Sequence, residues 1–262
     1  MPAVSTNLLP QPVPTASDPR SPKQQLRDRL LEARDREVSQ ILQRTPVNVR
    51  VEATKALSSP DLLDLVSRCA IALGMVGDRH LFITVFLVAI SRLLTKPLAA
   101  IIQGSSSSGK SHVCDVVVSM TPAESVVSAT SMTPKGLLAM DQGSLMHCLV
   151  PAGERTRRAS DLWRQLSGGE LTQMGGSRDP YRYQPGPIAF TTTTTSLEIF
   201  DEDANRCLLL SSDESAEQTR RVIDWVAATA AERPTGSRDE LLAVFHAAQR
   251  MLQRVHVVVP YA

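Results

Sequence analysis

Eight consecutive residues, from Gly104 to Ser111, read Gly-Ser-Ser-Ser-Ser-Gly-Lys-Ser and match the phosphate-binding pattern G-x-x-x-x-G-K-[ST], the P-loop. The two glycines allow the backbone to turn so that successive N–H groups converge on an anion. Lys110 would reach the β- and γ-phosphates of ATP, and the Ser111 hydroxyl would ligate Mg²⁺. The residues predicted to contact the nucleotide are Gly104, Ser105, Ser106, Ser107, Ser108, Gly109, Lys110, Ser111 and His112.

The segments on either side of this motif support a phosphate-binding loop. The apolar run 98–102 reads as a buried strand, and residues 111–120 can form a helix, so the motif lies between a strand and a helix as its function requires. A chance match in a chain of this length is on the order of one in a hundred. The alternative is a flexible serine-rich linker, but linkers are rarely flanked by a buried strand and an apolar helix.

Composition limits the classes of protein to which the chain can belong. The 262 residues include 28 basic and 27 acidic side chains, so no global positive field favours nucleic acid. The longest apolar stretch, 81–90, is too short to span a bilayer. No C-x-x-C spacing links the cysteines, which we interpret as small buried hydrophobic residues of a cytoplasmic protein: Cys69, Cys114, Cys148 and Cys207.

Strand and helix patterns alternate along the chain, which predicts an α/β fold. We expect a P-loop NTPase three-layer sandwich with a central, mostly parallel sheet. Residues 1–22 hold six prolines and are predicted to be a disordered tail, residues 23–95 a helical N-terminal cap, and residues 96–262 the nucleotide-binding core. The expected helices are 23–44, 62–73, 80–94, 111–120, 133–140, 156–166, 214–231 and 238–254. The expected strands are 98–102, 125–129, 145–150, 188–193, 206–210 and 255–259, with an inserted hairpin over 168–183.

Glu154 is the candidate for the carboxylate that a nucleotide hydrolase needs to orient or deprotonate water. It ends a segment that begins with the apolar run 145–150. Gly153 stands where a Mg²⁺-directed Asp is usual, and Pro151 interrupts the strand pattern. The alternative for Glu154 is a surface ion pair with Arg157 or Arg158.

Two further polar residues are candidates for catalytic roles. Thr193, within the threonine run 191–195, could position the attacking water at a strand end, although threonine is also a good strand former. Arg206 opens an apolar strand and could reach the γ-phosphate of an adjacent subunit as an arginine finger. Its alternative is a local ion pair with Asp203 or Glu202.

The order of these segments resembles an AAA+-type ATPase domain. The resemblance is closest to the domains linked to CHC2-zinc-finger DNA primases of bacterial plasmids, phages and other mobile elements, and more distant to the minichromosome-maintenance helicases. It covers roughly residues 61–226, and the most similar stretch reads DANRCLLL at 203–210 followed by DES and EQTR up to 220. The resemblance implies roles for five residues: Lys110 and Ser111 at phosphate and Mg²⁺, Glu154 as the water-activating acid, Thr193 as the sensor and Arg206 as the finger.

The resemblance also implies partners. The hairpin over 170–183 would face DNA in the channel of a homo-oligomeric ring, where Arg178 and Arg182 could contact phosphates in a salt-sensitive manner. Nothing in the chain resembles a zinc finger or a primase centre, so priming is expected of a separate primase or replication partner. The chain also ends soon after residue 259, where the family usually continues, which suggests a shortened version.

The function expected from the sequence is therefore an ATP-binding, Mg²⁺-dependent ATPase that works in DNA replication of a mobile element. Two alternatives stay open. A non-catalytic nucleotide-binding module would explain the missing Asp before Glu154. A small-molecule or nucleotide kinase would use the same P-loop, with Arg155, Arg157 and Arg158 as a lid on the transferred phosphate.

Overall fold

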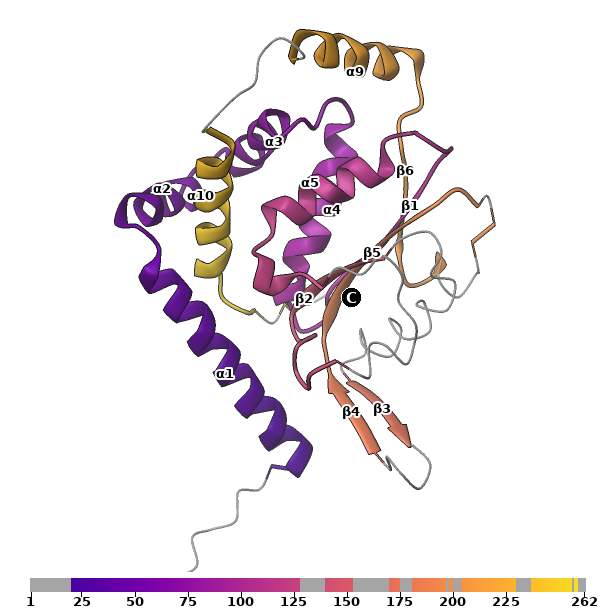
Figure 1. Ribbon diagram of the computed structural model, residues 1–262. Coiled ribbons are helices and arrows are strands. Elements are labelled where there is room, and N and C mark those ends of the chain that lie inside the picture. Colours follow the sequence, from indigo (N-terminus) through magenta and orange to yellow (C-terminus); the bar gives the residue numbers. More distant parts are fainter. Residues whose placement is uncertain are drawn as a thin grey trace, which may run out of the picture.

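A computed structural model gives the architecture of residues 20–127, 140–152, 170–174, 181–196, 198–199, 204–229, 237–255 and 257–258. A parallel sheet of four strands, in the order β2-β5-β1-β6, forms its centre (Figure 1). The strands are β1 (Ala99–Gln103), β2 (Cys148–Ala152), β5 (Ile188–Thr194) and β6 (Leu208–Ser211). A separate antiparallel pair consists of β3 (Glu170–Met174) and β4 (Tyr181–Pro185).

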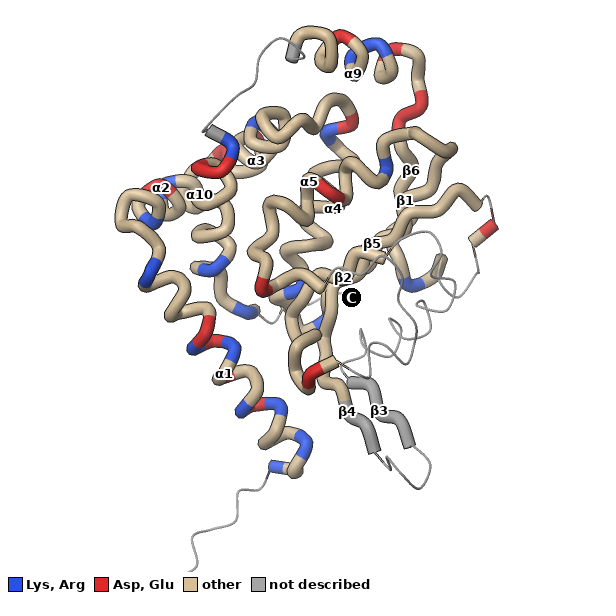
Figure 2. The backbone as a smooth tube through the Cα atoms, viewed as in Figure 1, with Lys and Arg blue, Asp and Glu red and all other residues tan. Residues whose placement is uncertain are grey.

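Of the described helices, four precede the first strand of the sheet and three follow it. They are α1 (Pro22–Arg44), α2 (Val47–Leu57), α3 (Leu62–Ala72), α4 (Arg79–Ile90), α5 (Lys110–Met120), α9 (Ala216–Thr229) and α10 (Ser237–Met251), with short 3₁₀ turns η1 (Ser91–Leu93) and η2 (Ala123–Ser125). Helices α4 and α5 cover one face of the sheet and pack against each other and against β5, while α10 packs between α2 and α5 (Figure 1). Basic and acidic side chains are interspersed along α1, which buries no residue completely (Figure 2).

Two apolar clusters lie on opposite faces of the sheet. Ile102 and Ala189 join the larger cluster, together with α3, α4, α5 and α10, whereas Ala99 and Phe190 face a smaller cluster on the other side. Successive strand residues point to opposite faces, so both faces of β1 and β5 must be apolar. This explains why these strands read as continuous apolar runs in the sequence.

The described elements confirm the predicted α/β fold, the parallel sheet and the N-terminal helical region. The predicted hairpin is present as β3 and β4. Three details differ among the residues that the structure describes. Strand β2 begins only at Cys148, Val126 of the predicted strand 125–129 forms an isolated bridge with Leu149, and Val255 of the predicted strand 255–259 forms one with Leu94. Each of these bridges joins one residue where the sequence pattern predicted a run. The predicted tail and the predicted helices over 133–140 and 156–166 lie wholly or almost wholly outside the described residues.

Helix α2 was not expected, because its valine-rich sequence shows no clear helical period. It begins directly after Pro46 and is covered by α10, which buries Ala53 and Ala56 completely or almost completely. Tertiary packing therefore decides its conformation, not local propensity.

The predictions about cysteine and membrane association are tested in part. All four cysteines are free thiols, and Cys69 and Cys148 are buried. Burial raises the pKa of the Cys69 thiol to about 11 and that of Cys114 to about 12, so both stay protonated. In the part of the chain with described structure, no helix has the length and apolar character needed to cross a membrane.

His147 fixes the start of β2. Its backbone is left-handed, with φ +54°, and its N–H donates to the carbonyl of Pro187 at 2.8 Å. The ring Nδ1 lies 2.6 Å from the Arg92 carbonyl oxygen and must donate to it, since a carbonyl only accepts. Burial lowers the pKa of His147 to about 4, although this hydrogen bond raises it, so the imidazole is neutral at pH 7.

We predict that His147 makes the protein less stable as the pH falls from about 6.5 to about 4. In that window the unfolded chain binds a proton at this imidazole and the folded chain does not, so the free energy of unfolding decreases. A pKa difference between 6.5 and about 4 corresponds to about 3 kcal/mol. Denaturant unfolding of the wild-type protein and of His147→Asn, which tolerates the left-handed backbone, measures the effect. Identical pH profiles for the two proteins would contradict it.

Candidate functional site

The turn from β1 to α5 has a backbone that only particular residues can adopt. Gly109 has φ +84° and Ser107 has φ +66°, so the chain is left-handed twice before α5 begins. Gly104 has little free space beside its Cα atom, because a Cβ there would lie 2.2 Å from Ser212 Oγ. The two glycines of the motif are therefore required for different reasons, Gly109 for its backbone angle and Gly104 for space.

Lys110 folds back over the turn. Its side chain is buried, and its Nζ donates to the carbonyl of Gly104 at 2.8 Å, to the carbonyl of Ser105, and to Ser108 Oγ at 3.2 Å. Ser108 Oγ also accepts a hydrogen bond from Ser212 Oγ at 2.9 Å. The ammonium thus lies inside the loop, bonded to its carbonyl and hydroxyl oxygens.

A carboxylate of the same chain accepts a hydrogen bond from one backbone N–H of the loop. The backbone N–H of Ser105 donates to Glu214 Oε1, and Glu214 comes from the segment that follows β6. The two hydrogen bonds from Ser105 lower the pKa of Glu214, and the charge of Lys110 lowers it further, so it is ionised at neutral pH. Figure 2 shows the acidic segment between β6 and α9 to which Glu214 belongs. The loop therefore already holds an anionic group of its own chain.

A pocket of about 430 Å³ opens beside the loop. Its polar lining includes the loop residues Ser105, Ser107 and Ser108 and the carboxylates of Asp78, Asp213 and Glu214. Its apolar lining includes Met75, Val76, Leu81, Val222 and Ile223. His112, on the first turn of α5, holds the wall in place through a contact of 2.9 Å between its Nε2 and the Gly74 carbonyl oxygen. The pocket therefore combines an anion-binding end with an apolar end.

Gln218 connects α9 to the apolar end of the pocket. Its Nε2 donates to the carbonyl of Val76 at 3.0 Å, and its amide lies so close to Gly77 that a Cβ on that glycine would be 1.6 Å away. Gly77 is also left-handed, with φ +109°. A glycine at this position is what allows α9 to close over the pocket.

Thr193 and Arg206 have different positions relative to the loop. Thr193 pairs with Ile102 in the register of β5 with β1, two residues before the loop begins, and is half-buried on the sheet face that α5 covers. Arg206 is exposed in the turn that precedes β6. The structure thus brings Thr193 close to the loop and leaves Arg206 at the surface.

Three predicted site residues cannot be placed in full. Glu154 and Arg178 lie outside the described residues, as does the tip of the hairpin. Arg182 belongs to β4, opposite Gln173 of β3, and only its backbone is described. Strand β2, which leads toward Glu154, is separated from β1 by β5.

Metal ligands are sparse in the described part of the site. Among the described residues, no group of three or more His, Cys, Asp or Glu side chains is placed to hold a metal ion. Ser111 is exposed at the start of α5, directly after Lys110, and its hydroxyl is the kind of hard oxygen ligand that Mg²⁺ accepts.

Comparison with known proteins gives no family for the chain. No family model matches it, and no curated protein shows significant sequence similarity to it.

Sequence reasoning missed three residues of the site: Ser212, Glu214 and Gln218. All three follow β6, and their proximity to the loop depends on β6 being the direct neighbour of β1. An acidic pair directly after an apolar strand was the one visible signal, since the carboxyl ends of parallel strands share one edge of a sheet.

We predict that Gly77→Ala lowers the free energy of unfolding by about 2 kcal/mol. The estimate combines about 1 kcal/mol for the lost hydrogen bond between Gln218 and Val76 with about 1 kcal/mol for left-handed strain. Denaturant titration measures the change. In a chain that already carries Gln218→Ala, the same substitution should cost only the strain, and an undiminished cost there would show that Gln218 is not involved.

Proposed function

We propose that the pocket between the loop, β6 and α9 binds ATP with Mg²⁺. The observation that carries this proposal is the strand-turn-helix geometry of residues 99–120, with two left-handed residues and the buried ammonium of Lys110. The β- and γ-phosphates would take the place of the Glu214 carboxylate at the Ser105 N–H, at the N-terminus of α5 where its dipole is positive. Lys110 would then exchange its carbonyl partners for phosphate oxygens, and the Ser111 hydroxyl would ligate Mg²⁺.

The apolar end of the pocket suits a purine base. Met75 and Val76 precede α4, and Val222 and Ile223 belong to α9, so a flat ring would lie between two apolar walls. The measured volume of about 430 Å³ falls within the range of small-molecule sites.

For the reaction we propose ATP hydrolysis by a domain of the AAA+ type. The support is the resemblance described above together with the position of Thr193 on the strand next to β1, where it can hold a water near the γ-phosphate. Glu154 would activate that water and Arg206, exposed before β6, would act on the nucleotide of a neighbouring subunit. Within this proposal the chain is a homo-oligomer that works with a primase in replication of a mobile element. The β3–β4 hairpin, with Arg178 and Arg182, contacts the DNA strand.

A second candidate function is nucleotide binding without turnover. It is favoured by Pro151 inside β2, by Gly153 where a Mg²⁺-directed Asp is usual, and by the Glu214 carboxylate in the loop. In this case ATP would control assembly or partner binding and would dissociate without having been hydrolysed.

We expect Lys110→Ala to weaken binding of Mg·ATP by about a hundredfold or more, because several charge-assisted hydrogen bonds to phosphate are lost. Titration calorimetry or a fluorescent ATP analogue measures the affinity, and circular dichroism checks that the fold is kept. Lys96→Ala removes the same charge from an exposed position near β1 and serves as the matched control. Undiminished affinity in Lys110→Ala would refute the proposed site.

Turnover assays on the same proteins separate the two functions. Hydrolysis that rises with protein concentration and with single-stranded DNA, and that is lost in Glu154→Gln, supports the ATPase. Binding without turnover, unchanged in Glu154→Gln, selects the non-catalytic module. Phosphate transfer to an added acceptor by monomeric protein would favour a kinase.

We expect Glu214→Gln to bind ATP about tenfold more tightly than the wild-type protein. The substitution keeps the shape of the side chain but removes the negative charge that competes with phosphate for Ser105 and Lys110. Glu217→Gln, on an exposed part of α9, changes the net charge equally and should leave affinity unchanged. Equal affinities for the two variants would contradict competition by Glu214.

A further inference from the structure

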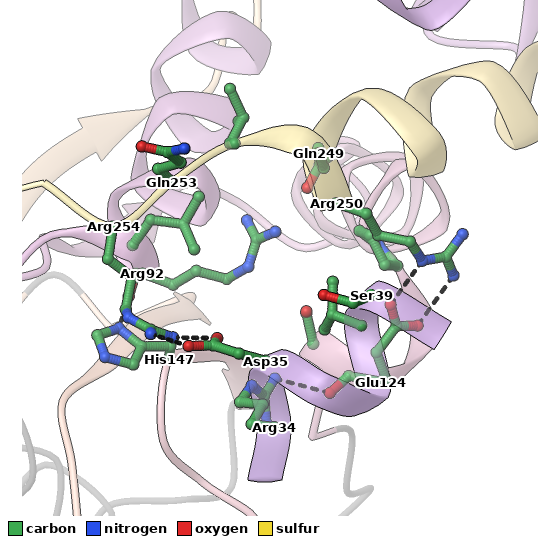
Figure 3. Close-up of a pocket in the computed structure, with 15 residues that line it drawn as sticks. Arg34, Asp35, Ser39, Arg92, Glu124, His147, Gln249, Arg250, Gln253 and Arg254 are labelled. Carbon is green, nitrogen blue, oxygen red and sulfur yellow. Dashed lines mark hydrogen bonds and ion pairs between the residues drawn. The ribbon is translucent and has the colours of Figure 1, made fainter. Parts of the chain in front are cut away.

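A second cavity, of about 390 Å³, lies at the opposite edge of the sheet from the loop. Its walls include η1, which precedes β1, and His147, which precedes β2, so it lies at the amino ends of the parallel strands. Helix α1, η2 and the end of α10 complete it, and Figure 3 shows the polar side chains that converge on it. Neither the P-loop nor any residue of the proposed ATP site lines this cavity.

The cavity has an excess of positive charge. Among its described lining residues, the carboxylates are those of Asp35 and Glu124 alone. The arginines that line it are Arg34, Arg92, Arg250 and Arg254. Both carboxylates are fully used. Arg250 donates from Nε and Nη2 to the two oxygens of Glu124 at 2.7 and 3.0 Å, and Arg254 donates to both oxygens of Asp35, at 2.7 Å to Oδ1.

The other two arginines have no carboxylate partner among the described residues. Arg34 donates from Nη2 to the Glu124 carbonyl oxygen at 2.8 Å and lies 3.3 Å from Cys148 Sγ. Arg92 is only 1% exposed; its Nη1 donates to the Ala89 carbonyl oxygen at 3.0 Å, and its Nε has no partner among the described residues. In Figure 3 the guanidinium of Arg92 points into the middle of the cavity.

The charge of Arg92 persists at neutral pH. Burial lowers the pKa of Arg92 only to about 10; Arg34 lowers it further, whereas Cys148 and Glu124 raise it. His147 is neutral at pH 7 and adds no charge. A buried guanidinium that bonds no carboxylate is costly, so an anion that enters the cavity would recover part of that cost.

One buried amide oxygen beside the cavity also lacks a partner among the described residues. Gln249 is 5% exposed; its Nε2 donates to the Met120 carbonyl oxygen at 2.7 Å, which fixes the orientation of the amide and leaves the buried Oε1 without a partner among the described residues. The Ser39 hydroxyl lies on the α1 side of the same cavity. An acceptor of this kind pairs with a hydroxyl group and not with a phosphate oxygen.

We propose that this cavity is a second ligand site, which binds a small phosphomonoester of a hydroxylated compound. Arg92 and Arg34 hold the dianionic phosphate, and Gln249 Oε1 accepts a hydrogen bond from a ligand hydroxyl. Because Arg34 and the Asp35–Arg254 pair link α1 to the rest of the cavity, a bound ligand also fastens α1 to the sheet.

Calorimetric titration of inorganic phosphate and of ribose 5-phosphate into the full chain carrying Lys110→Ala tests the proposal. The Lys110→Ala background removes phosphate binding at the loop, so the test does not depend on the proposed ATP site. We expect one ligand per chain, with ribose 5-phosphate binding at least threefold more tightly than phosphate. Hydrogen exchange should slow in α1 and η1 on binding.

Arg34→Gln should weaken both ligands at least fivefold, and Arg36→Gln, on an exposed position of the same helix, should change them by less than twofold. Arg92→Gln should abolish binding. Because Arg92 is buried, circular dichroism checks whether this variant still folds. If the Arg92→Gln variant unfolds, the result for Arg34→Gln alone tests the proposal. The proposal is overturned by absence of saturable binding in the Lys110→Ala chain, or by equal affinities of Arg34→Gln and Arg36→Gln. Equal affinity for phosphate and ribose 5-phosphate would overturn the hydroxyl contact at Gln249.

Discussion

The left-handed backbone at Gly109 is the constraint on which the candidate site depends. It ends the loop so that α5 begins at Lys110 and the lysine side chain turns back into the loop. Any residue with a Cβ would be strained there, although nothing occupies the space around it. The position of the ammonium and the direction of the α5 dipole relative to the loop both follow from this one turn.

A parallel sheet gives the molecule two chemically different edges. At the carboxyl edge the chain leaves β1, β5 and β6 through polar segments, and the loop, Thr193 and Glu214 meet there. At the amino edge, the segments that enter β1 and β2 bring Arg92 and His147 together under α1. The pocket beside the loop and the cavity lined by arginines therefore lie at opposite ends of the same strands, and the buried strand β1 lies between them.

The sequence predicted those helices and strands well whose conformation depends on neighbouring residues in the chain. The apolar runs of β1 and β5, the helices around Leu81 and Val113, and the turn between Gly104 and Lys110 all follow from patterns of neighbours in the chain. Helix α2 and the boundaries of β2 were not predictable, since burial by α10 and the left-handed His147 determine them. The site was predicted only as far as the motif reaches. Glu214 and Gln218 depend on the strand order, which no local pattern encodes, and the cavity lined by arginines gathers residues from five separate segments.

The contact between Glu214 and Ser105 has a mechanical consequence. Glu214 lies two residues before α9, and Gln218 on that helix is bound to Val76, so the helix is tethered at two points on opposite sides of the pocket. Displacement of the carboxylate by an incoming anion breaks one tether and leaves the other intact. The contacts that remain lie further along the helix, where Gln218 binds Val76 and the Trp225 ring lies beside Gly74, so only the start of α9 would be released.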